Sequence, residues 1–463
     1  MPSNKAGIIP RLCLRIAFPT FPVSPLNERP LTTALRPSAC PGLLRIVQAL
    51  DGGICRIKLN GGSIRSQQAV AVADAAERYA GGVIEATNRA NLQIRGIGRE
   101  QASLIDSLLA AGLGPSDAAG DDVRNLMLSP AAGIDRQMLF DTRPLADQIL
   151  ATVQRHERFH DLSAKFAVQL DGGEALAMLE HPHDLWLSAF ERDGELRLAF
   201  GLAGCPTDQP TGSVALDDGH DLVVAVLELF LELARPEQTR MRHLLAEYSI
   251  EDFLVRLAER VSVQGVTDGR RTADSSVLHI GAHPQAETGV IYVGAVPPLG
   301  RLDPATLRGA AQLADAFGDG SLRFTPWQGL LLPNIRNEHG TEVIRGLERL
   351  GLLCNADQSL TRMIACTGSN GCGKSLAETK GDARQLAALL QRHALSVHLS
   401  GCPRSCAAAH TAPVTLLAVA PGHYDLYFRD AAQSGFGALH ARNLTIEAVA
   451  ALLDARSRSP LDA

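Results

Sequence analysis

The pattern of hydrophobic and polar positions contains a strand–helix–strand unit that occurs twice along the chain. Each copy begins with an alternating apolar run, which predicts a strand, and continues through a Gly- or Pro-containing turn. An alanine-rich amphipathic stretch then predicts a helix, and a second apolar stretch predicts a further strand. The predicted segments are residues 53–59, 67–79 and 83–97 in the first copy and residues 289–296, 304–317 and 322–333 in the second. Units of this kind indicate a sheet layered with helices.

The two copies align at a constant shift, which indicates an internal duplication. The matched pairs, 238 positions apart, are Gly62 with Gly300, Ala76 with Ala314, Tyr79 with Phe317, Thr87 with Thr325, Leu92 with Leu330, Ile97 with Ile335, Arg124 with Arg362 and Gly133 with Gly371. Behind each copy lies a longer α/β segment, at residues 125–201 and 363–427, and two helices are predicted between the copies, at residues 221–234 and 250–260. Two unrelated α/β segments of similar composition are the alternative explanation.

Composition and charge restrict the classes of protein to which the chain can belong. Hydrophobic residues make up 46% and charged residues 20% of the 463 positions, as in a globular protein. The formal net charge of −6 disfavours nucleic-acid binding through overall charge. The longest apolar stretch contains Glu228 and Glu232, so no membrane span is expected. Residues 1–35 are rich in proline and are predicted to form a disordered leader, and a cytoplasmic location is expected.

Four of the nine cysteines form two close pairs, Cys366-x5-Cys372 and Cys402-x3-Cys406. Thiolates select zinc or iron–sulfur clusters, and the five-residue gap is wider than the usual spacing of structural zinc ligands. Both pairs lie in loops containing Gly and Pro, which are poor positions for buried core cysteines, the alternative explanation. The sequence therefore predicts a [4Fe–4S] cluster held by these four residues. The remaining five are interpreted as incidental thiols: Cys13, Cys40, Cys55, Cys205 and Cys354.

Two further motifs carry weaker signals. Residues 368–375 fit the phosphate-binding pattern G-x4-G-K-[ST], but only 88 residues follow Ser375, too few for most of a nucleotide-binding sheet. His156 and His160 fit the H-E-x-x-H pattern of zinc peptidases, but a solvated helix end explains them better. No supporting pattern surrounds the candidate third ligands, His181 and His183. The sequence contains no G-x-G-x-x-G, so a dinucleotide-binding site of that type is not supported.

A locally basic region is the second candidate site. Residues 56–99 hold seven basic and three acidic side chains. The candidate cations within it are Lys58, Arg89 and Arg95, and two more, Arg124 and Lys165, follow it in the sequence. Arg and Lys side chains that converge suit a small molecule with several negative charges, because guanidinium groups bind carboxylates in pairs of hydrogen bonds. An ordinary solvated surface is the alternative. The sequence identifies no catalytic residue.

These residues together resemble the nitrite/sulfite reductase superfamily and, within it, the precorrin-3B synthases of aerobic cobalamin biosynthesis. The resemblance spans residues 36–425 and implies an α+β fold, in which two ferredoxin-like half-domains pair with each other and two larger α/β domains follow. The segments that carry it are residues 36–43, 51–59, 87–95 and 240–245 and the two cysteine pairs, the second within Ser400-Gly-Cys-Pro-Arg-Ser-Cys406. The implied ranges are a leader at 1–35, half-domains at 36–110 and 246–350, and α/β domains at 111–245 and 351–463, the last carrying the cluster.

The resemblance also bears on the chemistry. In sirohaem reductases of this superfamily the last cysteine of the set, here Cys406, also bridges the cluster to the haem iron. Their substrate-binding cations would fall on Lys58, Arg124 and Lys165, but the usual Lys-x-Lys is here Lys165-Phe166-Ala167. Because reduction of a small oxyanion needs dense positive charge, this loss favours different chemistry in the same cavity.

The resemblance to the precorrin-3B synthases implies a monooxygenase, which hydroxylates precorrin-3A at the meso carbon C20 and forms a lactone from the ring A acetate. O2 would be the oxidant and NADH the formal electron donor, acting through a reductase or ferredoxin. The cluster would pass electrons to a second iron centre, either non-haem iron or sirohaem. The carboxylates of this anionic tetrapyrrole would be bound by Lys58, Arg89, Arg95, Arg124 and Lys165. A sirohaem-dependent nitrite or sulfite reductase is the alternative, and a P-loop nucleotide-binding protein is a distant one.

Overall fold

The computed structural model describes residues 40–115, 118–266, 269–273, 277–390 and 396–458. The predicted leader at residues 1–35, Cys13 and the start of the resemblance at residues 36–39 lie outside the described residues. Within the described part, four five-stranded sheets form the framework, two of ferredoxin-like type and two larger α/β sheets. None of the described helices is long and apolar enough to cross a membrane.

The two ferredoxin-like sheets exchange their edge strands. The first sheet has the order β1-β2-β5-β4-β13 and the second has the order β11-β12-β15-β14-β3. Strand β13 belongs to the second copy in sequence but pairs with β4 of the first, with Arg301 opposite Glu85. In the same way, β3 of the first copy pairs with β14 of the second. The bounds are β1 Val47–Ala49, β2 Gly52–Ile57, β3 Ser63–Arg65, β4 Val83–Ala86, β5 Leu92–Ile97, β11 Gly281–Pro284, β12 Val290–Ala295, β13 Arg301–Leu302, β14 Ser321–Phe324 and β15 Leu330–Arg336.

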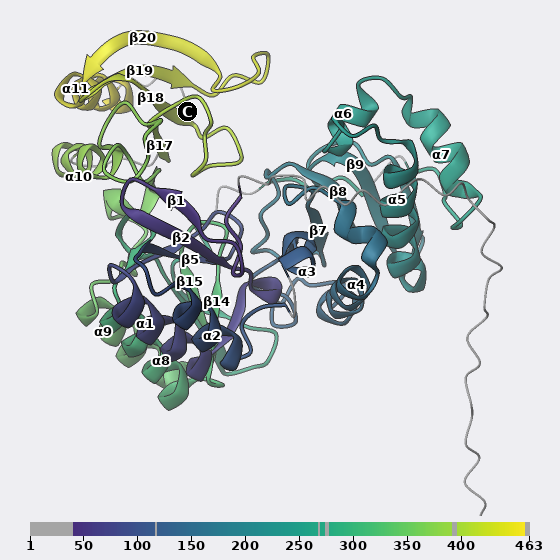
Figure 1. The fold of residues 1–463 in the computed structure, drawn as a ribbon, viewed down its shortest axis with the longest axis horizontal. Coiled ribbons are helices and arrows are strands. Elements are labelled where there is room, and N and C mark those ends of the chain that lie inside the picture. Colours follow the sequence, from purple (N-terminus) through teal and green to yellow (C-terminus); the bar gives the residue numbers. More distant parts are fainter. Residues whose placement is uncertain (1–39, 116–117, 267–268, 274–276, 391–395, 459–463) are drawn as a thin grey trace, which may run out of the picture. The chain divides into compact units, whose positions relative to one another are not determined.

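Four helices lie together on one side of these two sheets (Figure 1): α1 Ser66–Tyr79, α2 Gln101–Ala110, α8 Pro304–Phe317 and α9 Gly340–Arg349. The helical periodicity that predicts α1 places its buried residues three or four positions apart, at Ala69, Val72, Ala73 and Ala76. Helix α8 starts where Asp303 caps it, accepting a hydrogen bond from the N–H of Thr306 at 2.7 Å. Both helices have the bounds expected for equivalent elements of a duplication.

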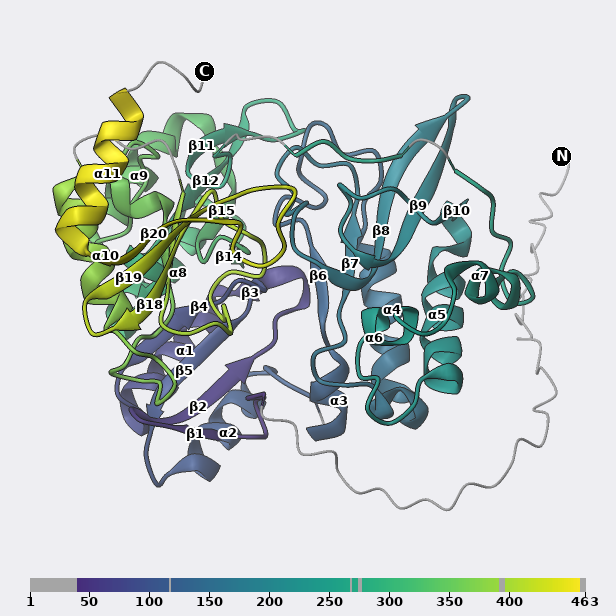
Figure 2. The same ribbon diagram turned by 90° about the horizontal axis from the view of Figure 1, so that it is seen from above.

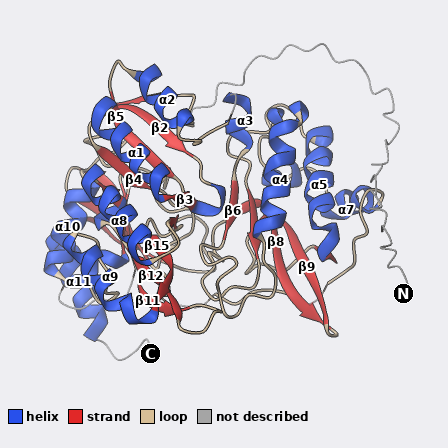
Figure 3. Ribbon diagram, turned by 90° about the horizontal axis from the view of Figure 1, so that it is seen from below, coloured by secondary structure: helices blue, strands red, loops and turns tan. Residues whose placement is uncertain are grey.

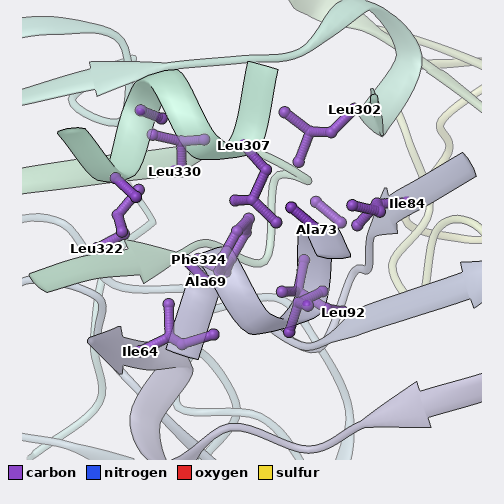
Figure 4. Close-up of a cluster of buried hydrophobic side chains, with 14 of the residues drawn as sticks. Ile64, Ala69, Ala73, Ile84, Leu92, Leu302, Leu307, Leu322, Phe324 and Leu330 are labelled. Atoms are coloured by element: carbon purple, nitrogen blue, oxygen red, sulfur yellow. The ribbon is translucent and has the colours of Figure 1, made fainter. Parts of the chain in front are cut away.

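Side chains from the two copies share one apolar core (Figure 4). Ala69 and Ala73 of α1 are small, so α8 approaches closely and its Leu307 lies beside them. The sheets contribute the other labelled side chains, Ile64, Ile84, Leu92, Leu302, Leu322, Phe324 and Leu330. Because each large aliphatic side chain contributes about 1.5–3 kcal/mol when fully buried, the two copies stabilise each other.

The two larger sheets have the same topology as each other. In each, the first three strands are parallel and the last two are antiparallel, in the orders β6-β7-β8-β9-β10 and β16-β17-β18-β19-β20. The first has bounds β6 Leu126–Leu128, β7 Val168–Asp171, β8 His183–Arg192, β9 Glu195–Gly204 and β10 Gly212–Ala215. The second has bounds β16 Met363–Ala365, β17 Val397–Ser400, β18 Val414–Ala420, β19 His423–Phe428 and β20 Ala438–Thr445.

Helices accompany both of these sheets. Those beside the first sheet, in part visible in Figure 3, are α3 Ala118–Val123, α4 Arg143–Arg155, α5 Gly219–Leu233, α6 Met241–Leu245 and α7 Ile250–Ala258. Those beside the second, in Figure 2, are α10 Thr379–Leu389 and α11 Ile446–Arg458. Each sheet has its own apolar core, with Phe200 and Phe253 among the buried residues of the first and Leu399 and Tyr424 among those of the second.

The predicted duplication and α+β fold are confirmed. A shift of 238 residues superimposes the bounds of β2 on β12, α1 on α8 and β4 on β14. The stretches 83–97 and 322–333, each predicted as one strand, are two strands each, because a turn reverses the chain. In the first turn the Thr87 hydroxyl accepts hydrogen bonds from the N–H groups of Arg89 and Asn91, at 3.3 and 3.1 Å. The domain boundaries drawn from the sequence stay a prediction.

Candidate functional site

The two predicted cysteine pairs lie at the ends of neighbouring strands. Cys366 and Cys372 are in the loop after β16, and Cys402 and Cys406 are in the loop after β17. Since β16 and β17 are parallel and adjacent, their carboxyl ends meet at one edge of the sheet, where α/β proteins bind ligands. All four cysteines line one pocket with a volume of about 160 Å³.

Backbone groups hold the two cysteine loops against each other. The N–H of Gly401 donates to Cys366 Sγ at 3.3 Å, and the N–H of Leu376 donates to the carbonyl of Gly401 at 2.9 Å. Position 401 requires glycine, because a Cβ there would stand 1.8 Å from Ser375 Oγ. Gly368 has a φ of +76°, a left-handed conformation that turns the chain between Cys366 and Cys372.

The residues around this pocket fit an iron–sulfur cluster. The donor set is four thiols, and a backbone N–H already points at one of the sulfurs, as amides do around cluster-ligating cysteines. Burial, and then the neighbouring thiolates of Cys402, Cys366 and Cys372, raise the pKa of Cys406, which places the four sulfurs within electrostatic range of one another. Among the described residues, no group of three or more His, Cys, Asp or Glu side chains is close enough together to bind a single metal ion.

The opposite wall of the pocket comes from the ferredoxin-like sheets. Asn88, in the turn between β4 and β5, donates from Nδ2 to the carbonyl of Cys406 at 3.4 Å. Gln328, in the equivalent turn of the second copy, donates from Nε2 to the carbonyl of Ala407 at 3.3 Å. Both turns of the duplication therefore contact the segment that follows Cys402.

Of the five predicted cations, only Arg95 lines this pocket. It is buried, and it binds Asp51 through Nε and Nη2 at 2.8 and 2.9 Å. Its Nη2 also donates to the carbonyl of Gly371 at 3.4 Å. Arg95 therefore connects the first ferredoxin-like sheet to the residue before Cys372.

Three of the other predicted cations lie elsewhere. Lys58 is buried and donates to the backbone carbonyls of Asp121 and Asp122, at 2.6 and 3.2 Å. Burial lowers the pKa of Lys58 to about 8. Arg124 forms an ion pair with Asp121 at 2.9 Å, and Lys165 is exposed. Lys58 and Arg124 thus have protein partners, and their predicted role in substrate binding stays a prediction, as it does for Lys165.

Arg89, the fifth predicted cation, follows Asn88 and lies among like charges. Burial, and then the guanidinium groups of Arg56 and Arg240, lower its pKa to about 10. No hydrogen bond or ion pair to its guanidinium is found among the described residues. Arg56 lines the pocket and can donate to the side-chain oxygen of Gln93, at 2.7 Å from Nη2. Arg56 was not singled out from the sequence, although it lies in the basic region.

Three charged residues near the cysteine loop were also not predicted from the sequence: Arg301 and Lys380, which contact the loop, and Glu85, which is paired with both. Glu85 and Lys380 line the pocket, and Arg301 donates from Nη2 to Thr367 Oγ1 at 3.0 Å. Lys380 is buried in α10, and burial lowers its pKa to about 8. A lone Lys or Glu in a predicted helix or strand is ordinarily exposed, so only the tertiary structure identifies these residues.

The structure does not support the two weaker motifs. Residues 368–375 do not lead directly into a helix: α10 begins at Thr379, four residues after Ser375, and Glu378 caps it. The phosphate-binding pattern therefore lacks the adjoining helix start on which it depends. His156 directly follows the last residue of α4, and His160 Nε2 contacts the carbonyl of Gln154 at 3.1 Å. This agrees with the helix-end interpretation of the H-E-x-x-H pattern.

Two protein-family models match this chain. "Nitrite/Sulfite reductase ferredoxin-like half domain" matches residues 47–112 and 283–350, and "Nitrite and sulphite reductase 4Fe-4S domain" matches residues 119–264. Together these ranges cover more than half of the chain. The 4Fe-4S match falls on the first α/β sheet, where Cys205 is the single cysteine, whereas the four clustered cysteines lie in the second.

Individual proteins and one solved structure are also similar to this chain. The chloroplastic ferredoxin–nitrite reductase of Zea mays is 31% identical over 392 residues, which are 78% of this chain and 68% of the relative. The precorrin-3B synthase of Sinorhizobium sp is 27% identical over 403 residues, which are 86% and 84% of the two chains. The structure of the Mycobacterium tuberculosis NirA protein superimposes with a TM-score of 0.74 at 21% identity, covering 89% of this chain and 82% of NirA.

Proposed function

The chain belongs to the nitrite/sulfite reductase family of redox enzymes, and on that premise we propose that it oxygenates an anionic tetrapyrrole, converting precorrin-3A to precorrin-3B. The proposal takes the family's iron–sulfur cluster to be bound by Cys366, Cys372, Cys402 and Cys406. When bound, the cluster supplies single electrons. The family membership itself rests on the comparisons, and the substrate is the part that is proposed.

The placement of the predicted cations carries this proposal. Reduction of a small oxyanion requires several positive charges at one point, to stabilise developing negative charge. Here Ala167 is buried where a second lysine would stand, Lys165 is exposed, and Arg124 is paired with Asp121. A compact set of cations is therefore not assembled from these positions.

A more extended basic surface is assembled instead. Arg56 lines the pocket, and Arg89 lies within electrostatic range of Arg56 and of Arg240, which is itself paired with Asp184. Separate guanidinium groups suit a ligand whose carboxylates are spread around a large ring, because each can bind one carboxylate through two hydrogen bonds. Arg56 and Arg89 would bind and orient the tetrapyrrole against the cluster loop.

The extent of the matches supports the same substrate. The alignment with the Sinorhizobium precorrin-3B synthase covers a larger share of both chains than the alignment with the maize nitrite reductase. The name of the maize relative supports ferredoxin as the immediate electron donor. The comparisons give no support to NADH, which was expected from the sequence as the formal donor.

Sirohaem-dependent reduction of nitrite or sulfite is the second candidate. The observation in its favour is the higher identity to ferredoxin–nitrite reductases, so the comparisons taken alone support it better than they support oxygenation. In that case the pocket would hold sirohaem as a cofactor, with Cys406 beside its iron, instead of a tetrapyrrole substrate.

One set of measurements separates the two candidates. The full chain, purified without oxygen and loaded with iron and sulfide, is incubated with precorrin-3A, 18O2 and enzymatically reduced ferredoxin. Oxygenation predicts a hydroxylactone that carries one 18O atom, with the second oxygen atom leaving as water. Consumption of nitrite or sulfite by protein that contains extractable sirohaem, with no labelled product, would establish the second candidate. Absence of all three activities would exclude both.

A further inference from the structure

Glu85 on β4 is the centre of a buried group of charges. Its carboxylate lies 2.9 Å from Arg301 Nε, 3.7 Å from Arg95 Nη1 and 3.8 Å from Lys380 Nζ. Burial alone would raise the pKa of Glu85, but the three cations hold it below its usual range, so the carboxylate is ionised. Elements far apart in sequence thus meet here: β4, β5, β13 and α10.

Each of the three cations also binds the loop that carries the first cysteine pair. Lys380 Nζ donates to the carbonyl of Ala365 at 3.1 Å, next to Cys366. Arg301 Nη2 donates to Thr367 Oγ1 at 3.0 Å, on the other side of Cys366. As described above, Arg95 donates to the carbonyl before Cys372. Through these contacts, Glu85 fixes three cations around both cysteines.

The duplication supplies a comparison within the same chain. At a shift of 238 residues, the counterpart of Glu85 is Arg323, and the cysteine loop corresponds to the cysteine-free loop after β6. Arg323 Nη1 donates directly to the carbonyls of Pro130 and Ala132, at 3.1 and 2.8 Å. The other charges near this loop, Arg143 and its partner Asp141, are partly exposed to solvent. A buried carboxylate that joins several cations to the loop is therefore found, among the described residues, in the half that has the cysteines.

These charges act at short range on whatever the cysteines hold. Glu85, Arg95 and Lys380 line the same pocket as the four thiols. Counting Asp51, which is bound to Arg95, three positive and two negative groups leave one net positive charge. Buried charges are weakly screened by salt, so this excess is felt at the pocket.

We propose that Glu85 and Lys380 set the reduction potential of the cluster bound by the four cysteines, in addition to positioning its loop. Reduction adds one negative charge to the cluster. Lys380 stabilises that charge and raises the potential, whereas Glu85 opposes it and lowers the potential. The inference rests on the cluster assumed in the proposed function and is independent of the substrate.

The test is a potentiometric titration of the reconstituted full chain, followed by electron paramagnetic resonance. Lys380→Met is expected to lower the potential and Glu85→Gln to raise it. Each should change the ratio of reduced to oxidised cluster at a fixed potential by about tenfold, which is about 59 mV for a one-electron couple. Titrations are run well below the pKa of about 8 of Lys380, so that its ammonium stays charged.

Lys374→Met is the matched control, because this lysine is exposed on the same loop and solvent screens its charge. Its potential should equal that of the unchanged chain. The proposal would be overturned if the reduction potentials of Lys380→Met and Glu85→Gln shifted in the same direction, or if neither shifted. Loss of loop structure alone gives no reason for the two potentials to shift in opposite directions. If Lys380→Met does not fold, the direction of the Glu85→Gln shift decides. Failure of oxygenation leaves these potentials measurable, so the two proposals fail separately.

Discussion

His181 and His410 stack on each other, with ring centroids 5.0 Å apart and ring planes inclined by 29°. His181 lies between β7 and β8, and His410 lies between β17 and β18, so the two occupy corresponding loops of the two α/β sheets. The pair joins the loop of Cys402 and Cys406 to its cysteine-free counterpart. Both ring nitrogens of His181 are buried without a protein partner among the described residues.

Buried histidines near this contact make stability depend on pH. Burial lowers the pKa of His183 to about 3 and of His398 to about 4, and it lowers that of His181 well below the usual value. In the unfolded chain these histidines gain protons near pH 6.5, whereas in the folded chain they stay neutral. Their contribution to the free energy of unfolding is therefore fully present above pH 6.5 and is lost as the pH falls towards about 4. Each histidine contributes a loss of about 1.4 kcal/mol per pH unit. Urea unfolding at a series of pH values measures this slope, which His398→Gln should reduce by one histidine. An unchanged slope in that variant would contradict the assignment.

Gly401 permits the close contact between the two cysteine loops. In Gly401→Ala the new Cβ would overlap Ser375 Oγ and lie 3.3 Å from Cys366 Sγ, so the loops must separate. We expect this variant to lose most of its iron and sulfide, measured per chain after reconstitution. Gly373→Ala is the control on the same loop, because the atoms nearest to its Cβ would be 3.9 Å away. Adding Ser375→Gly to Gly401→Ala should restore part of the iron. Equal iron contents in the two single variants would show that the contact is unimportant.

The cysteine positions distinguish the two α/β sheets. Cys372→Ser is expected to abolish a stable four-iron cluster, because a serine hydroxyl is a much weaker ligand than a thiolate at neutral pH. Cys205→Ser is the informative control, since Cys205 is the cysteine within the range that matches the 4Fe-4S description but lies outside the pocket. It should keep full iron content and the unchanged visible absorbance. Loss of iron in Cys205→Ser with retention in Cys372→Ser would instead place the cluster at the first α/β sheet, and would contradict its assignment to the four clustered cysteines.

Arg89 is expected to bind a carboxylate of the tetrapyrrole. Arg89→Gln should weaken binding of uroporphyrin, a porphyrin with many carboxylates, by about tenfold, because a hydrogen bond to a charged group contributes about 1.5–3 kcal/mol. Stability should not fall, since the guanidinium lies among like charges in the folded chain. Fluorescence titration and thermal unfolding measure the two effects. Arg349→Gln removes an exposed guanidinium on α9, outside the lining of the pocket, and serves as the control. Unaltered affinity in Arg89→Gln would remove this residue from the binding surface.

The sequence was sufficient for the features that depend on spacing. The duplication and the bounds of α1 and α8 follow from periodicity. The grouping of four cysteines at one place follows from their spacing and from the Gly and Pro residues of their loops. Features that depend on long-range contacts were not predictable. Two-residue β13 has no strand pattern of its own, and Lys380 reads as an ordinary helix lysine until its contacts with Glu85 and two carbonyls are seen. The partners of Lys58 are backbone atoms 63 and 64 residues away, so its burial is equally invisible in the sequence.

The exchange of β3 and β13 imposes an order on how the protein matures. The first ferredoxin-like sheet acquires its last strand when Arg301 pairs beside Glu85, across a separation of 216 residues. During synthesis that edge stays open until the second copy has left the ribosome. Glu85 and Arg301 are also two of the residues that surround the cysteine loop. Closure of this sheet therefore also brings together two of the charged side chains that surround the cysteine loop.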